Sequence, residues 1–273
     1  MLSRTTDGGE SWEPARSIMP TNANLWTFGN QIAVMGDGTL VDVFQFSQGS
    51  GVQPADQRKY GALISTDAGQ SWSRIVELAD DQIVPVRDPD DADPVRVAPE
   101  LPEVASDTAE PGTVYVVWPD GRFSDGVRTD IAFTKSSDGG RTWSMPIRIN
   151  QTPGTANPLN GQAFLPSVAV SADGTIGVVY YDFRFNTPDP DTLPTAVFLA
   201  HSQDGGATWQ DTQIAAPFDF ETAPLSDRGY FIGDYVGLAA DGLDFVSAFS
   251  IANDGNLGNR TDLVSVRADA VTP

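Results

Sequence analysis

The sequence predicts an all-β fold built from repeated four-stranded antiparallel units, and three observations lead to this prediction. One pattern, Ser/Thr-x-Asp-x-Gly-x-Ser/Thr-Trp, occurs four times, in segments 5–12, 65–72, 136–143 and 202–209. The tryptophans of the four copies lie 60, 71 and 66 residues apart, which is typical of a repeated supersecondary unit. Short apolar runs are separated by turns rich in the chain's 26 Gly and 20 Pro, and helical periodicity is absent.

The repeated pattern itself predicts a tight hairpin loop. Its Gly at the fifth position allows a positive φ at little steric cost. Its Asp can accept hydrogen bonds from backbone N–H groups of the same turn, and its Trp can anchor the loop by burying a large ring. Because an active site is needed once but a loop clasp is needed in every repeat, we expect a structural role for Asp7, Trp12, Asp67, Trp72, Asp138, Trp143, Asp204 and Trp209.

The apolar runs divide one domain, 1–273, into five units. A half unit at 1–20 is followed by full units at about 24–80, 98–150 and 162–216, and by a partial unit at 228–269. Such a four-strand meander is what a β-propeller blade requires. The expected strands are 31–35, 40–46, 60–65 and 73–78, then 101–105, 114–118, 130–135 and 145–149, then 167–170, 176–180, 196–201 and 212–215, and finally 235–239, 245–249 and 262–266.

The pattern resembles the Asp box of sialidases and related bacterial neuraminidase repeat (BNR) proteins, which are β-propellers. Sialidases are six-bladed, so the resemblance implies that these units are an incomplete portion of a six-bladed ring. The alternative is a four-bladed ring in which the half blade at 1–20 completes the last blade. An open ring exposes sheet faces and edges, and we therefore expect association through them.

Composition and charge exclude several classes of function. The formal net charge is −21, which argues against a nucleic-acid partner and against attraction to anionic membranes. The chain has no Cys and a single His, so thiolate and histidine metal clusters are not expected. Neither a membrane span nor a signal peptide is visible in the sequence, and acidity together with the repeat type favours an extracellular or periplasmic location.

Candidate functional residues lie in the loops at the end of the blades opposite the boxes. Two adjacent blades end their second strand with Asp-x-Arg, at Asp120-Gly-Arg122 and Asp182-Phe-Arg184, and the other blades lack this pair. These side chains either contact a ligand or pair locally at the end of the strand. The start of the last blade, 227–235, falls at the same end and carries Gly-Asp-Tyr, which resembles a segment of sialidase-like BNR proteins.

The resemblance to sialidases implies roles for these residues. Sialidases hold the substrate carboxylate with an arginine cluster and use a Tyr nucleophile helped by a Glu, with an Asp as acid/base. The candidates are Asp120, Asp182, Asp234 and Tyr235 for catalysis, and Arg122, Arg184, Arg228, Tyr181 and Tyr230 for substrate binding. The sequence departs from the sialidase pattern in two ways, because it has no Arg-Ile-Pro segment and no Glu that aligns with the partner of the nucleophilic Tyr.

The sequence therefore predicts a glycan-directed glycoside hydrolase resembling exo-α-sialidases. The alternative is a non-catalytic Asp-box propeller that binds glycan or protein partners. No cofactor is expected, although the acidic runs at 88–93 and 189–191 offer the hard oxygen ligands that Ca²⁺ prefers. Solvated loops are the other interpretation of these runs.

Overall fold

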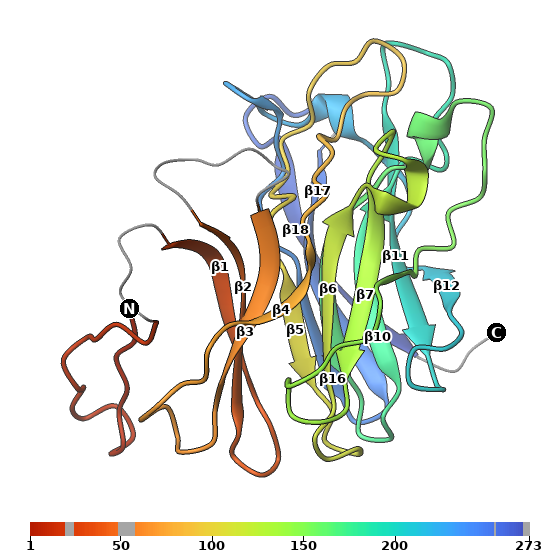
Figure 1. Cartoon of the computed structure of the whole chain (residues 1–273). Helices are drawn as coiled ribbons and strands as arrows, with labels where there is room; N and C mark the ends of the chain where they lie inside the picture. The colour runs from red at the N-terminus through yellow and green to blue at the C-terminus, as the bar shows by residue number, and fades with distance from the viewer. Residues whose placement is uncertain (20–24, 49–57, 254, 270–273) are drawn as a thin grey trace.

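The computed structural model describes residues 1–19, 25–48, 58–253 and 255–269, and shows antiparallel sheets arranged side by side (Figure 1). The predicted all-β fold of four-stranded antiparallel blades is confirmed. The end of the expected half blade at residue 20 and the start of the expected blade at residue 24 lie outside the described residues.

Each full sheet is a meander whose strands pair in chain order. The first contains β1 (Leu25–Val34), β2 (Leu40–Gln48), β3 (Arg58–Ser65) and β4 (Val76–Asp80). The second contains β5 (Glu103–Ser106), β6 (Val114–Asp120), β7 (Asp130–Ser136) and β8 (Ile147–Arg148). The third contains β9 (Ala163–Val170), β10 (Ile176–Asp182), β11 (Pro194–Ser202) and β12 (Gln210–Gln213), with β13 (Phe218–Asp219) also pairing β11.

The last sheet has three strands, β16 (Gly237–Asp241), β17 (Asp244–Ala252) and β18 (Thr261–Asp269). A small hairpin, β14 (Leu225–Ser226) and β15 (Gly229–Tyr230), precedes it. Single 3-10 turns lie in connecting segments: η2 (Arg122–Ser124), η3 (Pro158–Gly161) and η4 (Phe220–Thr222). None of the helices in the described part of the chain is long and apolar enough to cross a bilayer.

The hydrophobic core lies between neighbouring sheets. The first strands β1, β5, β9 and β16 contact one another in that order, so adjacent sheets pack against one another. Tyr60 of the first sheet meets Trp118 of the second with ring centroids 5.0 Å apart, and both side chains are fully buried. Burial of such large rings is the main favourable contribution at each interface.

The box loops have the predicted hydrogen bonds. In the second sheet, Asp138 accepts from the backbone N–H and the hydroxyl of Thr142, at 2.9 and 2.7 Å, and from the hydroxyl of Ser136 at 2.8 Å. The same bonds recur around Asp7, Asp67 and Asp204. Gly139 N–H donates to the carbonyl of Gly112, so the box lies beside the β5–β6 turn, at one end of the blade.

The prediction that every box tryptophan is buried is wrong for Trp12, which is 62% exposed. Trp209 packs edge-on against Phe133 of the preceding sheet, with ring centroids 5.1 Å apart, and Trp143 packs into the interface with the first sheet. The hairpin that carries Trp12 packs on the next box, through Arg4 and Arg16. At this exposure, Trp12 does not anchor its loop in the way that Trp143 and Trp209 anchor theirs.

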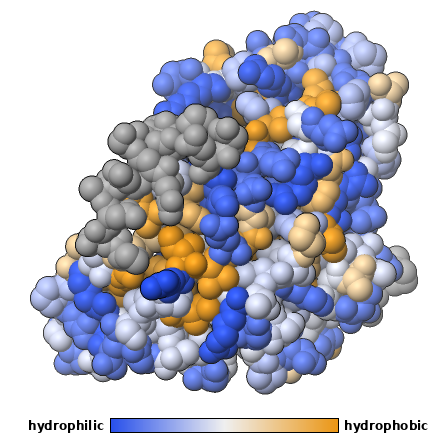
Figure 2. Space-filling model, viewed as in Figure 1, coloured by the Kyte–Doolittle hydropathy of each residue, from blue (hydrophilic) through white to orange (hydrophobic). Residues whose placement is uncertain are grey.

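The first sheet also has apolar side chains on its surface. Figure 2 shows apolar surface gathered below the grey atoms, in the part of the view where β1 to β3 lie in Figure 1. Ile32 and Val34 of β1 are 42% and 62% exposed. The expected association through such faces stays a prediction.

Candidate functional site

The first Asp-x-Arg pair is a local clamp. Asp120 is fully buried and accepts from the indole Nε1 of Trp118 at 2.6 Å and from Arg122 Nε and Nη2 at 2.9 and 2.8 Å. Arg122 Nη2 also donates to the carbonyl of Asp80 at 2.6 Å. The guanidinium therefore joins the end of β6 to the end of β4 in the neighbouring sheet, and its Nε and Nη2 donate to protein groups.

In the second pair, Asp182 and Arg184, the arginine has more side-chain partners than Arg122 has in the first. Arg184 donates to Asp182 at 2.7 Å, to Asp211 at 2.9 Å and to the hydroxyl of Tyr180 at 3.0 Å. Its guanidinium carbon lies 3.4 Å from the ring centroid of Phe198, a cation–π contact. Asp182 is fully buried and also accepts from a threonine hydroxyl. This arrangement neutralises a buried carboxylate, as a buried charge requires.

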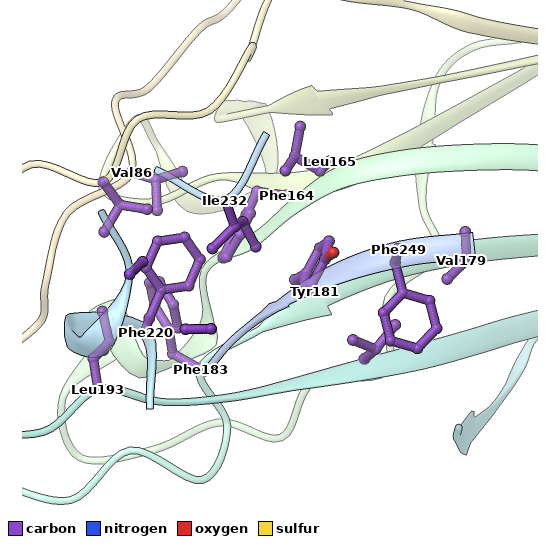
Figure 3. Close-up of a cluster of buried hydrophobic side chains, with 14 residues drawn as sticks. Val86, Phe164, Leu165, Val179, Tyr181, Phe183, Leu193, Phe220, Ile232 and Phe249 are labelled. Carbon is purple, nitrogen blue, oxygen red and sulfur yellow. The ribbon is translucent and has the colours of Figure 1, made fainter. Parts of the chain in front are cut away.

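Tyr181 lies on the other side of β10 in the hydrophobic core (Figure 3). Its side chain is 1% exposed, and its hydroxyl donates to the carbonyl of Ser250 at 2.7 Å. Burial raises the pKa of this phenol. None of the residues of the two Asp-x-Arg pairs lines the cavity described next, and neither does Tyr181.

A cavity of about 390 Å³ lies between β1 and two connecting segments. The first segment, 83–101, connects the first and second sheets, and the second, 228–235, leads into the last sheet. Phe28 of β1 forms one wall, and Arg228, Asp234 and Tyr235 lie in the other. We call this space the front pocket, because it lies at the end of the blades opposite the boxes.

The two connecting segments are held together through their backbones. Val95 forms a parallel bridge with Tyr230, Arg96 N–H donates to the Tyr230 carbonyl, and Tyr230 N–H donates to the Pro94 carbonyl. Gly229 makes this approach possible, because a Cβ there would lie 1.8 Å from the Pro94 oxygen, and its φ is +112°.

The wall of the front pocket opposite β1 packs on the hydrophobic core. Val86 of the first segment and Ile232 of the second are buried in one apolar cluster with Phe164 and Phe220 (Figure 3). Because this cluster also contains strands of the third and last sheets, it ties both connecting segments to the rigid blades.

Three arginines, Arg87, Arg96 and Arg228, line the front pocket together with two carboxylates, Glu100 and Asp234. Arg96 pairs with Asp234 at 3.4 Å and lies 4.0 Å from the ring centroid of Phe231. Arg87 and Arg228 are exposed, and the side chain of Arg228 forms no hydrogen bond or ion pair with any residue that the structure describes. Tyr235 is 76% exposed. The front pocket thus has a guanidinium available for an anion in a chain of net charge −21.

Tyr230 does not line the front pocket but lies behind it, near a group of carboxylates. Burial, and then Glu221, raises the pKa of its phenol. Burial, and then the nearby Asp88, raise the pKa of Glu221 to about 7. Asp88 is fully buried; its Oδ1 accepts from the Asp90 N–H at 2.8 Å, while its Oδ2 lacks a hydrogen-bond partner among the described residues.

The calcium expectation for the acidic runs gains no support from this geometry. Within residues 1–19, 25–48, 58–253 and 255–269, no group of three or more His, Cys, Asp or Glu side chains is arranged to hold a metal ion. Calcium binding at 88–93 or 189–191 therefore stays a prediction.

Among the charged residues of the front pocket, the sequence interpretation missed Arg87, Arg96 and Glu100. All three lie in the connection between β4 and β5, residues 81–102, which has no strand or helix of its own in the structure. A connection of this length inside a compact domain is uncommon and usually functional. Its length and its two arginines were the available signal.

Comparisons with known proteins agree with the fold. The BNR/Asp-box repeat family matches residues 63–74, which contain the second box. No curated protein matches the chain. Among solved structures, a Hadza microbial sialidase is similar, with a TM-score of 0.53 and 16% identity over 88% of this chain and 44% of the sialidase.

Matches to two further structures of this fold cover a larger share of those proteins. A protein of unknown function from Dyadobacter fermentans has a TM-score of 0.52 and 14% identity, and the match covers 91% of this chain and 67% of that protein. A GH93 α-L-arabinofuranosidase of Fusarium graminearum, in complex with arabinobiose, has a TM-score of 0.50 and 17% identity, and the match covers 93% of this chain and 66% of the arabinofuranosidase. The chain thus carries the BNR/Asp-box repeat and has the fold of sialidase-like β-propellers, and it spans less than half of the sialidase.

Proposed function

We propose that this chain is part of a glycan-directed β-propeller related to exo-α-sialidases, with its ligand site in the front pocket. The observation that carries the proposal is the convergence of Arg228, Asp234 and Tyr235 on one cavity at the end opposite the boxes. Those three residues were candidates from the sequence alone, and Arg87 and Arg96 join them in the structure. The fold of the similar glycoside hydrolases supports this proposal.

In this proposal, Arg228 and Arg87 bind the anionic group of an acidic sugar, because guanidinium groups match carboxylates in bidentate geometry. Tyr235 supplies an accessible phenol for nucleophilic attack, and Asp234 supplies a carboxylate held in place by Arg96. Asp120–Arg122 and Asp182–Arg184 act as clamps of the blade ends, since Nε and Nη2 of each arginine already donate to protein groups.

The test is release of the fluorophore from a 4-methylumbelliferyl α-sialoside. We expect Tyr235→Phe and Arg228→Ala to abolish turnover while the far-UV and near-UV circular dichroism stay unchanged. Phe185→Ala is a matched control, because Phe185 is 42% exposed and does not line the front pocket. Full activity of both pocket variants would remove these residues from the mechanism.

A second function is a propeller that binds glycan without hydrolysing it. It is favoured by the pairing of Asp234 with Arg96 at 3.4 Å, because the Arg96 guanidinium already engages the carboxylate that catalysis would need to contact the glycosidic oxygen. This function predicts saturable binding of the sialoside with no product, and measurable turnover would exclude it.

We also propose an extracellular or periplasmic location, in keeping with a glycan ligand and with an acidic chain that has no cysteine. The exposed apolar side chains of β1 and of the first box hairpin support association through these faces. Sedimentation of the purified chain over a range of concentrations tests this association.

A further inference from the structure

Two aromatic rings are stacked on each other on β1, next to the front pocket. Trp26 and Phe28 are parallel within 5°, with ring centroids 5.6 Å apart. They are 45% and 40% exposed, although large aromatic side chains at such positions usually pack into a core. We call this pair the aromatic platform.

The backbone of β1 directs the aromatic platform toward the front pocket. The register with β2 shifts between Phe28 and Gln31, and Gly29 has a φ of +67° in this bulge. Before the bulge, Trp26 and Phe28 stand opposite Ser47 and Gln45. A bulge changes which side chains face each side of a strand, and natural proteins use it to re-aim side chains near functional sites.

Gly29 also fixes the position of the platform relative to the pocket. A Cβ on Gly29 would lie 2.8 Å from Leu101 Cδ2, and Leu101 lines the front pocket together with Phe28. The platform is therefore continuous with the pocket through Phe28. A ligand held by Arg228 at one wall can reach Phe28 at the other and extend beyond it to Trp26.

We propose that the aromatic platform is a subsite for neutral pyranose rings of an oligosaccharide whose acidic end occupies the front pocket. One face of a pyranose ring carries C–H bonds that point the same way, and an aromatic face combines apolar surface with a negative quadrupole that attracts them. Parallel rings at this separation overlap in an offset stack, so a pyranose ring can stack on the outer face of either ring. This subsite rests on the proposed glycan function and specifies the ligand as an oligosaccharide.

The test compares three probes by saturation-transfer NMR: N-acetylneuraminic acid, lactose and 3′-sialyllactose. We expect Trp26→Ala to weaken binding of lactose and of 3′-sialyllactose about tenfold, the loss of one good aromatic contact of about 1.4 kcal/mol. It should leave binding of N-acetylneuraminic acid within about twofold, because Trp26 does not line the front pocket. Val34→Ala is the matched control, since Val34 is exposed on β1 beyond the bulge.

The outcomes separate the subsite from the proposed function. If 3′-sialyllactose binds equally well to the wild type and to Trp26→Ala, the subsite is overturned while the function stands. If lactose binding depends on Trp26 and N-acetylneuraminic acid does not bind at all, the subsite stands and the acidic-sugar function fails. Absence of binding for all three probes would overturn the subsite as well.

Discussion

Glu103 on β5 offers a test of the burial that the blade packing creates. Its Oε1 accepts from Gln31 Nε2 of β1 at 2.6 Å, and no cation compensates its charge among the described residues. Burial raises the pKa of this carboxyl from its ordinary 4.5 to about 7. We predict that Glu103→Gln makes the protein more stable at high pH.

The size and sign of this stability change follow from the coupling between proton binding and folding. Because the pKa of Glu103 is higher in the folded state than in the unfolded state, the folded state binds the proton more tightly. Protonation of Glu103 therefore contributes fully to stability below pH 4.5, and this contribution is lost as the pH rises through 7. At about 1.4 kcal/mol per pKa unit, the difference between 4.5 and about 7 corresponds to about 3 kcal/mol. Gln keeps the shape and an acceptor oxygen for Gln31 but cannot ionise.

The assay is equilibrium unfolding in urea at pH 4.5, 6 and 8.5. We expect the variant and the wild type to agree at pH 4.5 and the variant to gain stability progressively, up to about 3 kcal/mol at pH 8.5. Glu10→Gln, exposed in the first box loop, controls for the loss of one negative charge. A constant difference between Glu103→Gln and the wild type at all three pH values would refute the reasoning.

Three more predictions concern the clamps, the front pocket and the boxes. Arg184→Ala leaves Asp182 buried without its cation and should lower the free energy of unfolding by about 3–5 kcal/mol. In the same urea titration, Arg228→Ala should change the free energy of unfolding by less than about 0.5 kcal/mol. Equal losses of stability in the two variants would contradict the clamp assignment. Gly229→Ala should separate segments 94–96 and 229–231 and expose the Arg96 and Tyr230 amides to hydrogen exchange, whereas Gly242→Ala, with open space around it, should leave them protected. Hydrogen bonds from Thr208 and Ser202 lower the pKa of Asp204 to about 2, so the stability that this carboxylate contributes is present above pH 3.8 and is lost as the pH falls toward 2. Asp204→Asn should therefore make the melting temperature depend less on pH between 3.8 and 2. An unchanged pH dependence would count against the box geometry.

The blades could be predicted because their determinants are local. The hydrogen bonds of Asp138 reach only from Ser136 to Thr142, so an eight-residue pattern contains the whole loop. The strands follow from apolar alternation and turn residues, which act over short distances. The burial of Trp12 could not be predicted from the same pattern, because it depends on whether another sheet packs against that loop.

The candidate site was only partly predictable, for the same reason. Arg228, Asp234 and Tyr235 were identified because they come just before a first strand, at a known end of the blade. Arg122 and Arg184 have the same kind of position, but the sequence does not show that each guanidinium turns back to the carboxylate two residues earlier. Arg96 was missed, and its meeting with Phe28 could not be predicted, because both depend on a long irregular connection and on a bulge, which are set by tertiary contacts.

The most direct test of the front pocket is a crystal structure of the chain soaked with 3′-sialyllactose. The account predicts electron density for the acidic sugar beside Arg228, with the neutral rings over Phe28 and Trp26. Density for the ligand at Arg122 or Arg184, or among the box loops at the opposite end of the blades, would contradict it.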